Sequence, residues 1–285
     1  MPSLIDIRRR IRSVKSTQQI TRAMKLVSAA KLRRAQDRVL AARPYSAELA
    51  KLLADVARSA KTDERLVHPL LAERPAAHIQ LILITADRGL AGAFNSNLIK
   101  AAQQFLAEHA AKEVEMEIVG RKGRDFFRKR HGAISGERVG MTEKATYAYA
   151  ADIAKNIIAR FASGEIDAVY LLYNEFKSVM TQRLVVSRIL PVELPPEAEA
   201  IEFIFEQPPA RMLDKLLPRY VEIAIYQALL ESGAAQQAAR MTAMDAATSN
   251  AAEMIDNLTL YMNRVRQASI TREIIEVVSG AAGVE

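Results

Sequence analysis

Residues 3–43, SLIDIRRRIRSVKSTQQITRAMKLVSAAKLRRAQDRVLAAR, give the strongest indication of the fold. Neither Gly nor Pro occurs in them before Pro44, and Ser3 followed by Asp6 is typical of a helix start, where such side chains bond free backbone N–H groups. At 1.5 Å per residue a helix of this length extends about 60 Å. The stretch therefore predicts one long N-terminal helix, which we expect to continue past Pro44.

The apolar residues of this helix form a coiled-coil seam that turns polar partway along. Its first members are spaced three and four residues apart: Leu4, Ile7, Ile11 and Val14. The same register continues through polar positions and then returns to apolar ones: Gln18, Thr21, Lys25, Ser28, Leu32, Ala35 and Val39. Beside the polar break lies a displaced apolar stripe: Ile20, Met24 and Val27. A seam that shifts in this way predicts a helix that contacts different neighbours along its length.

The end of the chain predicts a second long helix, about 90 Å over residues 219–278 if it is continuous. Gly233 is the only interior breaker in that range. Of the thirty residues 223–252 eleven are Ala, which lets another helix approach closely, and three are charged: Glu231, Arg240 and Asp245. Further along, we expect the seam to include Met254, Leu258, Met262 (or Tyr261) and Val265.

The middle of the chain has the pattern of an α/β domain. Short apolar or β-branched runs predict strands: His78–Ala86, Val114–Val119, Ala168–Tyr173, Thr181–Val192 and Ile201–Phe205. Between them lie predicted helices: Asn95–Ala111, Lys122–Lys129 and Thr142–Ala162. Strands that alternate with helices favour a Rossmann-like fold with a mainly parallel sheet.

These segments predict three parts: a coiled-coil helix at 1–60, a central α/β domain at 76–206 and a second coiled-coil helix at 209–285. Two helices of this length cannot bury themselves on a central domain of about 130 residues. We therefore expect them to pair with each other in an antiparallel coiled coil.

The positive charge is concentrated at the start of the chain. Residues 1–43 hold twelve Lys and Arg against two Asp, whereas the remainder holds 28 basic and 31 acidic residues. Such a segment favours an acidic partner, which leaves nucleic acid, an anionic membrane surface and a carboxylate-rich protein open. Residues 1–43 contain no aromatic residue on which bases could stack, and their apolar seam favours a protein partner over nucleic acid.

Composition excludes several classes of site. The chain has no Cys, so it has no disulfide, thiolate metal site or cysteine nucleophile. Its four His lack metal-ligand spacing. No run of about 18 apolar residues could span a membrane. The N-terminus lacks the apolar core of a signal peptide, which makes the cytoplasmic side the expected location.

One loop invites a nucleotide-binding interpretation. Asp87–Gly92 (DRGLAG) follows a predicted strand and precedes a helix, but its two Gly match neither phosphate-binding motif. We expect a structural turn, with Asn95 as the cap of the following helix. A nucleotide-binding α/β enzyme and a basic coiled coil that binds nucleic acid are the alternatives.

Three separated stretches resemble the gamma subunit of F-type ATP synthases. Ile7–Arg34 resembles the N-terminal helix of that family, and Gln237–Gly283 resembles its C-terminal helix, above all in AARMTAMDAATSNA (238–251) and RQASITREIIEVVSGAAG (266–283). The strand and turn Leu83–Asn95 (LITADRGLAGAFN) also match. The resemblance covers essentially the whole chain, and the absence of Cys agrees with a bacterial-type subunit.

The resemblance implies a rotor shaft that couples ion-driven ring rotation to conformational cycling of the catalytic sites for ATP synthesis. The helix pair would lie inside a hexamer of three alpha and three beta subunits. The α/β domain would lie with the epsilon subunit on the membrane c-ring, at the cytoplasmic face of the bacterial inner membrane. The chain itself would hold no catalytic residue, cofactor, metal or nucleic acid.

The resemblance also implies partner contacts at eight positions. Those facing an acidic loop of a beta subunit would be Met24 and Lys25. Those facing the catch loops of the hexamer would be Arg266, Gln267 and Thr271. Those facing the c-ring would be Glu202, Phe203 and Glu206.

Overall fold

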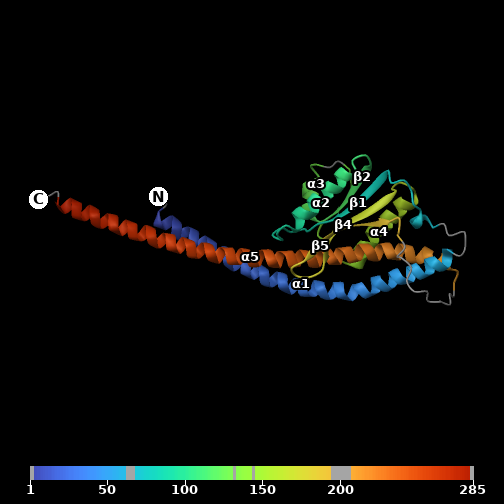
Figure 1. Ribbon diagram of the computed structural model, residues 1–285, viewed down its shortest axis with the longest axis horizontal. Coiled ribbons are helices and arrows are strands. Elements are labelled where there is room, and N and C mark those ends of the chain that lie inside the picture. Colours follow the sequence, from blue (N-terminus) through green and yellow to red (C-terminus); the bar gives the residue numbers. More distant parts are fainter. Residues whose placement is uncertain (1–2, 62–67, 131–132, 143–144, 194–206, 283–285) are drawn as a thin grey trace. The chain divides into compact units, whose positions relative to one another are not determined.

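A computed structural model describes residues 3–61, 68–130, 133–142, 145–193 and 207–282 (Figure 1). The chain divides into two compact units. Unit 1 comprises residues 1–28 and 241–285, and unit 2 comprises residues 29–240. Two long helices run through both units: α1 (Leu4–Lys61) and α5 (Pro209–Ala282). Both predicted long helices are confirmed, and Pro44 and Pro218 lie inside them without ending them.

Unit 2 contains a five-stranded sheet. Its strands are β1 (His78–Ile84), β2 (Glu113–Val119), β3 (Ile134–Arg138), β4 (Ala168–Phe176) and β5 (Gln182–Leu190). Their order is β3-β2-β1-β4-β5, and only the β4–β5 pair is antiparallel. The mainly parallel sheet is thus confirmed. Strand β3 was not predicted, and the predicted strand Ile201–Phe205 lies outside the described residues.

Short helices connect the parallel strands. They are α2 (Phe94–Glu108), α3 (Arg121–Phe127) and α4 (Tyr147–Ala162), and a 3-10 turn, η1 (Pro69–Leu71), precedes β1. In Figure 1, α2 and α3 lie on the side of the sheet away from α5. The start of α4 contacts α5, since the ring of Tyr147 packs edge-on against Tyr226 with centroids 6.0 Å apart. The helix predicted from Thr142 begins later, at Tyr147.

The core of unit 2 includes both the sheet and the inner segments of the long helices. In β1 every residue after His78 is buried. In α5, every residue from Ala228 to Arg240 except Gly233 and Ala239 is buried, which explains the Ala-rich sequence, because only small side chains leave room for close neighbours on all sides. Leu53 and Val56 of α1, beyond Pro44, are fully buried.

Within unit 1, α1 and α5 pair in antiparallel fashion. The hydroxyls of Thr21 and Thr248 lie 2.8 Å apart, and Lys25 contacts Asp245. The later residue of α1 thus contacts the earlier residue of α5, as antiparallel helices require. The predicted polar break is confirmed, because Thr21 and Ser28 are buried. On α5 the seam prediction is wrong at Met254, which is 45% exposed, whereas the smaller Ala251 is buried.

The start of α1 has the predicted cap. The Ser3 hydroxyl accepts a hydrogen bond from the Asp6 backbone N–H at 3.2 Å and donates one to the Asp6 carboxylate at 2.8 Å. The Ser3 hydroxyl therefore satisfies one of the backbone N–H groups that lack an intrahelical acceptor, and the Asp6 carboxylate holds that hydroxyl in place.

Candidate partner interface

The α1 segment of unit 1 presents apolar side chains to solvent. Ile20, Leu26 and Val27 are between 56% and 65% exposed, while polar residues occupy the seam. Large apolar side chains would normally fill a coiled-coil seam, and their outward position exposes them where another molecule can cover them. The displaced apolar stripe of the sequence is therefore a surface of the helix pair at Ile20 and Val27.

Met24 and Lys25 lie at the edge of this surface. Both are half-buried, and the Lys25 ammonium donates to the Asp245 carboxylate at 2.5 Å. The side chains of this pair are 39% and 56% exposed, so solvent screens their attraction. Lys25 thus has an acid within its own chain, and a second acid from a partner would have to compete with it.

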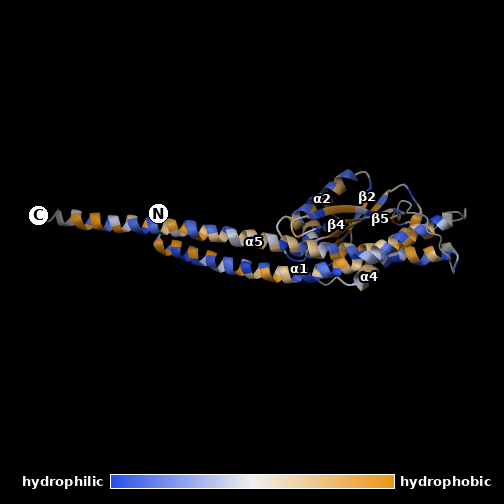
Figure 2. Ribbon diagram, turned by 60° about the horizontal axis from the view of Figure 1, so that its bottom comes forward, coloured by the Kyte–Doolittle hydropathy of each residue, from blue (hydrophilic) through white to orange (hydrophobic). Residues whose placement is uncertain are grey.

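The end of α5 is an apolar helix without a covering element among the described residues. Every residue from Arg266 to Ser279 except Ser269 is exposed, so the three predicted contacts Arg266, Gln267 and Thr271 all face solvent. They stand among exposed apolar residues: Ile270, Ile274, Ile275, Val277 and Val278. Figure 2 shows apolar positions recurring along this segment. The other three predicted contacts, Glu202, Phe203 and Glu206, lie outside the described residues.

Further basic residues of α1 line a cavity of about 260 Å³ within unit 2. Lys31, Arg34 and Arg38 lie on its α1 side, and Leu229 and Gln237 of α5 lie opposite them. Among the described residues neither Arg34 nor Arg38 makes an ion pair. Their uncompensated charge favours an acidic partner, as the charge distribution of the sequence predicts.

An ion pair in unit 2 joins α1, α5 and the sheet. The buried Glu231 carboxylate accepts hydrogen bonds from Arg43 at 2.9 and 3.1 Å and from the Phe176 backbone N–H at 3.0 Å. Arg43 also donates to the Phe176 carbonyl at 2.7 Å. The hydrogen bond to Glu231 raises the pKa of Arg43. Sequence reasoning did not find this cluster, although Glu231 is conspicuous as one of three charged residues in the Ala-rich run 223–252.

The loop Asp87–Gly92 is a structural turn. The Asp87 carboxylate accepts hydrogen bonds from the backbone N–H groups of Arg121 and Gly140 and from the Thr142 hydroxyl, at 2.8 to 3.1 Å. An anion bound at these strand ends would have to displace a carboxylate that already uses these donors. The arrangement therefore does not favour the nucleotide-binding alternative.

Gly120 and Asn95 allow close packing around this turn. Gly120 has φ +101°, and a Cβ there would lie 2.1 Å from the Thr85 carbonyl oxygen, so only Gly permits the approach. The prediction that Asn95 caps a helix is wrong, because α2 begins at Phe94 with Ala93 as its cap. Asn95 instead accepts a hydrogen bond from the Ala86 backbone N–H at 3.0 Å, which fixes the loop to the helix.

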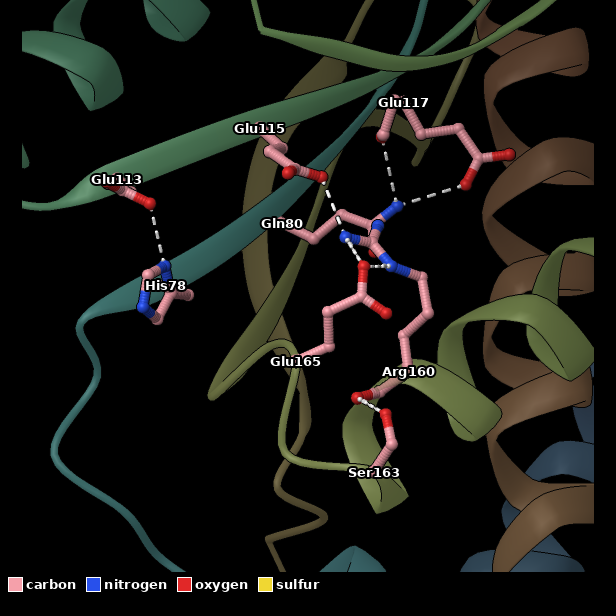
Figure 3. A network of polar contacts seen from close by, with 9 residues as sticks. His78, Gln80, Glu113, Glu115, Glu117, Arg160, Ser163 and Glu165 are labelled. Carbon is pink, nitrogen blue, oxygen red and sulfur yellow. Dashed lines mark hydrogen bonds and ion pairs between the residues drawn. The ribbon is translucent and has the colours of Figure 1, made fainter.

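A network of charged side chains crosses β1, β2 and α4 (Figure 3). Arg160 donates to Glu115 at 2.9 Å and to Glu165 at 2.7 Å, and its hydrogen bond to Glu165 raises its pKa. Gln80, which is fully buried, donates to Glu117 at 3.3 Å. The network therefore holds the sheet to α4 through charge-assisted hydrogen bonds.

Among the described residues, no group of His, Asp and Glu side chains is arranged to hold a metal ion. None of the described helices is long and apolar enough to cross a membrane.

Comparison with known proteins gives full-length matches. The family model described as ATP synthase matches residues 3–284. The ATP synthase gamma chain of Solibacter usitatus is 64% identical over 286 residues, and that of Pelotomaculum thermopropionicum is 53% identical over 288 residues; each match covers 100% of both chains. These matches do not support the nucleic-acid-binding alternative.

Solved structures share the fold at lower identity. A chain of the Euglena gracilis mitochondrial ATP synthase, from a structure of its OSCP, F1 and c-ring, has a TM-score of 0.69 and 18% identity, with 99% of this chain and 94% of that chain covered. A chain of the central stalk and c-ring of the Tetrahymena thermophila enzyme has a TM-score of 0.61 and 23% identity over 80% of this chain and 99% of that one. By its full-length family match and the identity of its relatives, the chain belongs to the ATP synthase gamma chain family.

Proposed function

We propose that the chain is the central rotor shaft of an F-type ATP synthase, a non-catalytic subunit that couples ion-driven rotation of a membrane c-ring to conformational cycling of a catalytic hexamer. The full-length identity to ATP synthase gamma chains carries this proposal. Its partners are three alpha and three beta subunits around the helix pair, with the epsilon subunit and the c-ring at the α/β domain.

The exposed surfaces of the helix pair support this role physically. A shaft that turns inside a sleeve needs contacts that shift at low cost, and apolar contacts are non-directional. The exposed Ile and Val side chains at the end of α5 meet that need. Basic residues also provide contacts that shift at low cost, because solvent screening keeps their attraction to acidic loops weak.

We also propose the partner contacts that the family resemblance implies. Met24 and Lys25, which lie where the apolar stripe meets a screened ion pair, face an acidic loop of a beta subunit. Arg266, Gln267 and Thr271 are exposed along the end of α5 and meet the catch loops of the hexamer. For the c-ring contact, we propose Glu202, Phe203 and Glu206 on the basis of the sequence alone.

The proposed location is the cytoplasmic face of the bacterial inner membrane, where the chain is held peripherally by the c-ring. This position needs no membrane span from the chain itself. Release by a wash that removes the hexamer from membranes, with the c-ring retained, would distinguish a peripheral from an integral position.

Native mass spectrometry of complexes purified through a tag on this chain tests the proposal. We expect one copy of the chain with three copies each of two larger nucleotide-binding subunits. A free chain, or a chain carrying nucleic acid, would contradict the shaft function and would direct attention to the basic segment of α1.

A further inference from the structure

Arg43, Glu231 and the backbone of Phe176 form a closed ring of hydrogen bonds, here named the clamp. Glu231 binds both Arg43 and the Phe176 N–H, and Arg43 binds the Phe176 carbonyl. Both backbone polar groups of Phe176, the last residue of β4, are therefore tied to the two long helices. All three residues belong to unit 2, so the clamp joins α1, α5 and the sheet inside one compact body.

The clamp is a directional contact between the two long helices and the sheet. Apolar side chains can slide past one another at low cost, whereas charge-assisted hydrogen bonds are short and oriented. The Glu231 side chain is only 1% exposed, so water cannot readily replace its partners when the ring is stretched. The bidentate contact with Arg43 fixes the angle between guanidinium and carboxylate as well as their distance.

We propose that the clamp transmits torque between the sheet of unit 2 and its helix pair, with Arg43 and Glu231 as positioning residues. This inference rests on the proposed function, in which the α/β domain receives rotation from the c-ring and the helices deliver it to the hexamer. Directional bonds at the end of β4 resist rotation of the sheet about the helices, a motion that apolar packing alone resists weakly.

The test uses the whole complex in sealed vesicles and measures protons pumped per ATP hydrolysed. Glu231→Gln keeps the shape of the side chain but replaces one acceptor oxygen by an NH₂ donor. Each carboxylate oxygen of Glu231 accepts a hydrogen bond from Arg43, and one of them also accepts from the Phe176 N–H. Whichever oxygen the NH₂ replaces, it therefore faces another donor and a hydrogen bond is lost. Arg43→Lys keeps the charge but loses the bidentate contact.

Two controls separate torque transmission from other effects. Glu48→Gln makes the same chemical change on α1 at an exposed pair, where Glu48 binds Lys51 at 2.7 Å. Leu98→Ala opens a cavity under α2, where Leu98 is fully buried, and so loosens unit 2 without altering the clamp.

We expect Glu231→Gln and Arg43→Lys to lower the pumped protons per ATP by about twofold or more, because each breaks the buried network at a shared partner. Both controls should keep the ratio of the unsubstituted complex, although Leu98→Ala should also lower the unfolding temperature. If Glu231→Gln prevents assembly, Arg43→Lys decides the question by the same ratio.

An unchanged ratio in the assembled clamp variants would overturn the proposal, and so would an equal fall in Leu98→Ala. Failure of the proposed function looks different, because the unsubstituted chain would then not assemble with the hexamer or support pumping. The two failures are therefore distinguishable within one set of vesicles.

Discussion

The inner and outer segments of the same two helices meet opposite environments. In unit 2, α5 between Ala228 and Arg240 is almost entirely buried by its own chain. In unit 1, α5 between Arg266 and Ser279 is almost entirely exposed, although it is rich in Ile and Val. The inner segment is Ala-rich because neighbours of its own chain surround it, and the apolar outer segment is suited to being covered by other chains.

Two of the ion pairs formed by these helices, one in each unit, repeat the difference. Lys25–Asp245 in unit 1 has side chains 39% and 56% exposed, whereas in the Arg43–Glu231 pair of unit 2 the acid is 1% exposed and also binds the sheet. An exposed pair is screened and adjustable, and a buried one is fixed. The chain thus has a rigid attachment where its own parts join and a screened contact in unit 1, where we propose that a partner docks.

The largest expected effect tests burial along α5 directly. Leu229→Ala, at a fully buried position, should lower the free energy of unfolding by about 2 to 5 kcal/mol through lost transfer energy and a residual cavity. The matched variant Ile275→Ala, at a position 58% exposed, should change it by less than about 0.5 kcal/mol. Urea unfolding of the full chain measures the free energy of unfolding of both variants. Similar losses in the two would contradict the difference in burial between the inner and outer segments of α5.

The next effect concerns alkaline pH. Burial, together with the negative charges of Glu175 and Glu231, raises the pKa of Tyr173 to about 12 from an ordinary value of 10.0. Above pH 10 the unfolded chain loses this proton first, so stability falls as pH rises toward 12, by about 2 kcal/mol from this group. Tyr173→Phe should remove that part of the decline in urea unfolding between pH 9 and 12. An identical decline in both proteins would refute the prediction.

A charge added at the outer surface should affect coupling without affecting folding. Met24→Lys places a second cation beside Lys25, which should hold an acidic partner loop in one rotary position. We expect ATP-driven proton pumping per ATP to fall by about half, because a persistent ionic contact favours one state over the others. Met24→Leu, which adds no charge, is the control. Unchanged pumping in Met24→Lys would count against the contact.

The smallest effect is expected at the exposed ion pair of unit 1. Asp245→Asn should change the free energy of unfolding by less than about 1 kcal/mol, since both partners are solvated. Added salt should shrink the difference further. Urea unfolding at two ionic strengths tests this, and a loss comparable to that of Leu229→Ala would show that the pair is as important as buried packing.

Periodicity and composition predicted the long helices and most of the sheet. The polar break at Thr21 and Ser28 was visible because the register of the seam continued through it. Strand β3 was not visible, since its sequence ISGER has no apolar run and alternates between half-buried and exposed positions at the edge of the sheet. It is a strand because it pairs with β2, and the periodicity of the segment alone does not reveal that pairing.

The clamp shows a second limit of sequence reasoning. Glu231 stands out as one of three charges in an Ala-rich run, and such an acid needs a partner when buried. The sequence does not say which of twelve basic residues near the N-terminus supplies it, since Arg43 lies 188 positions away. The partner contacts of unit 1 are harder still, because their other halves belong to other chains.

Rotation of this chain inside its complex is the most direct test of the account. The chain has no Cys, so Met180→Cys, at a position 81% exposed in unit 2, provides a single attachment point on it for a bead. With the hexamer fixed to a surface, ATP should drive rotation of the bead in one direction. ATP hydrolysis by the same complexes with a stationary bead would contradict the shaft function.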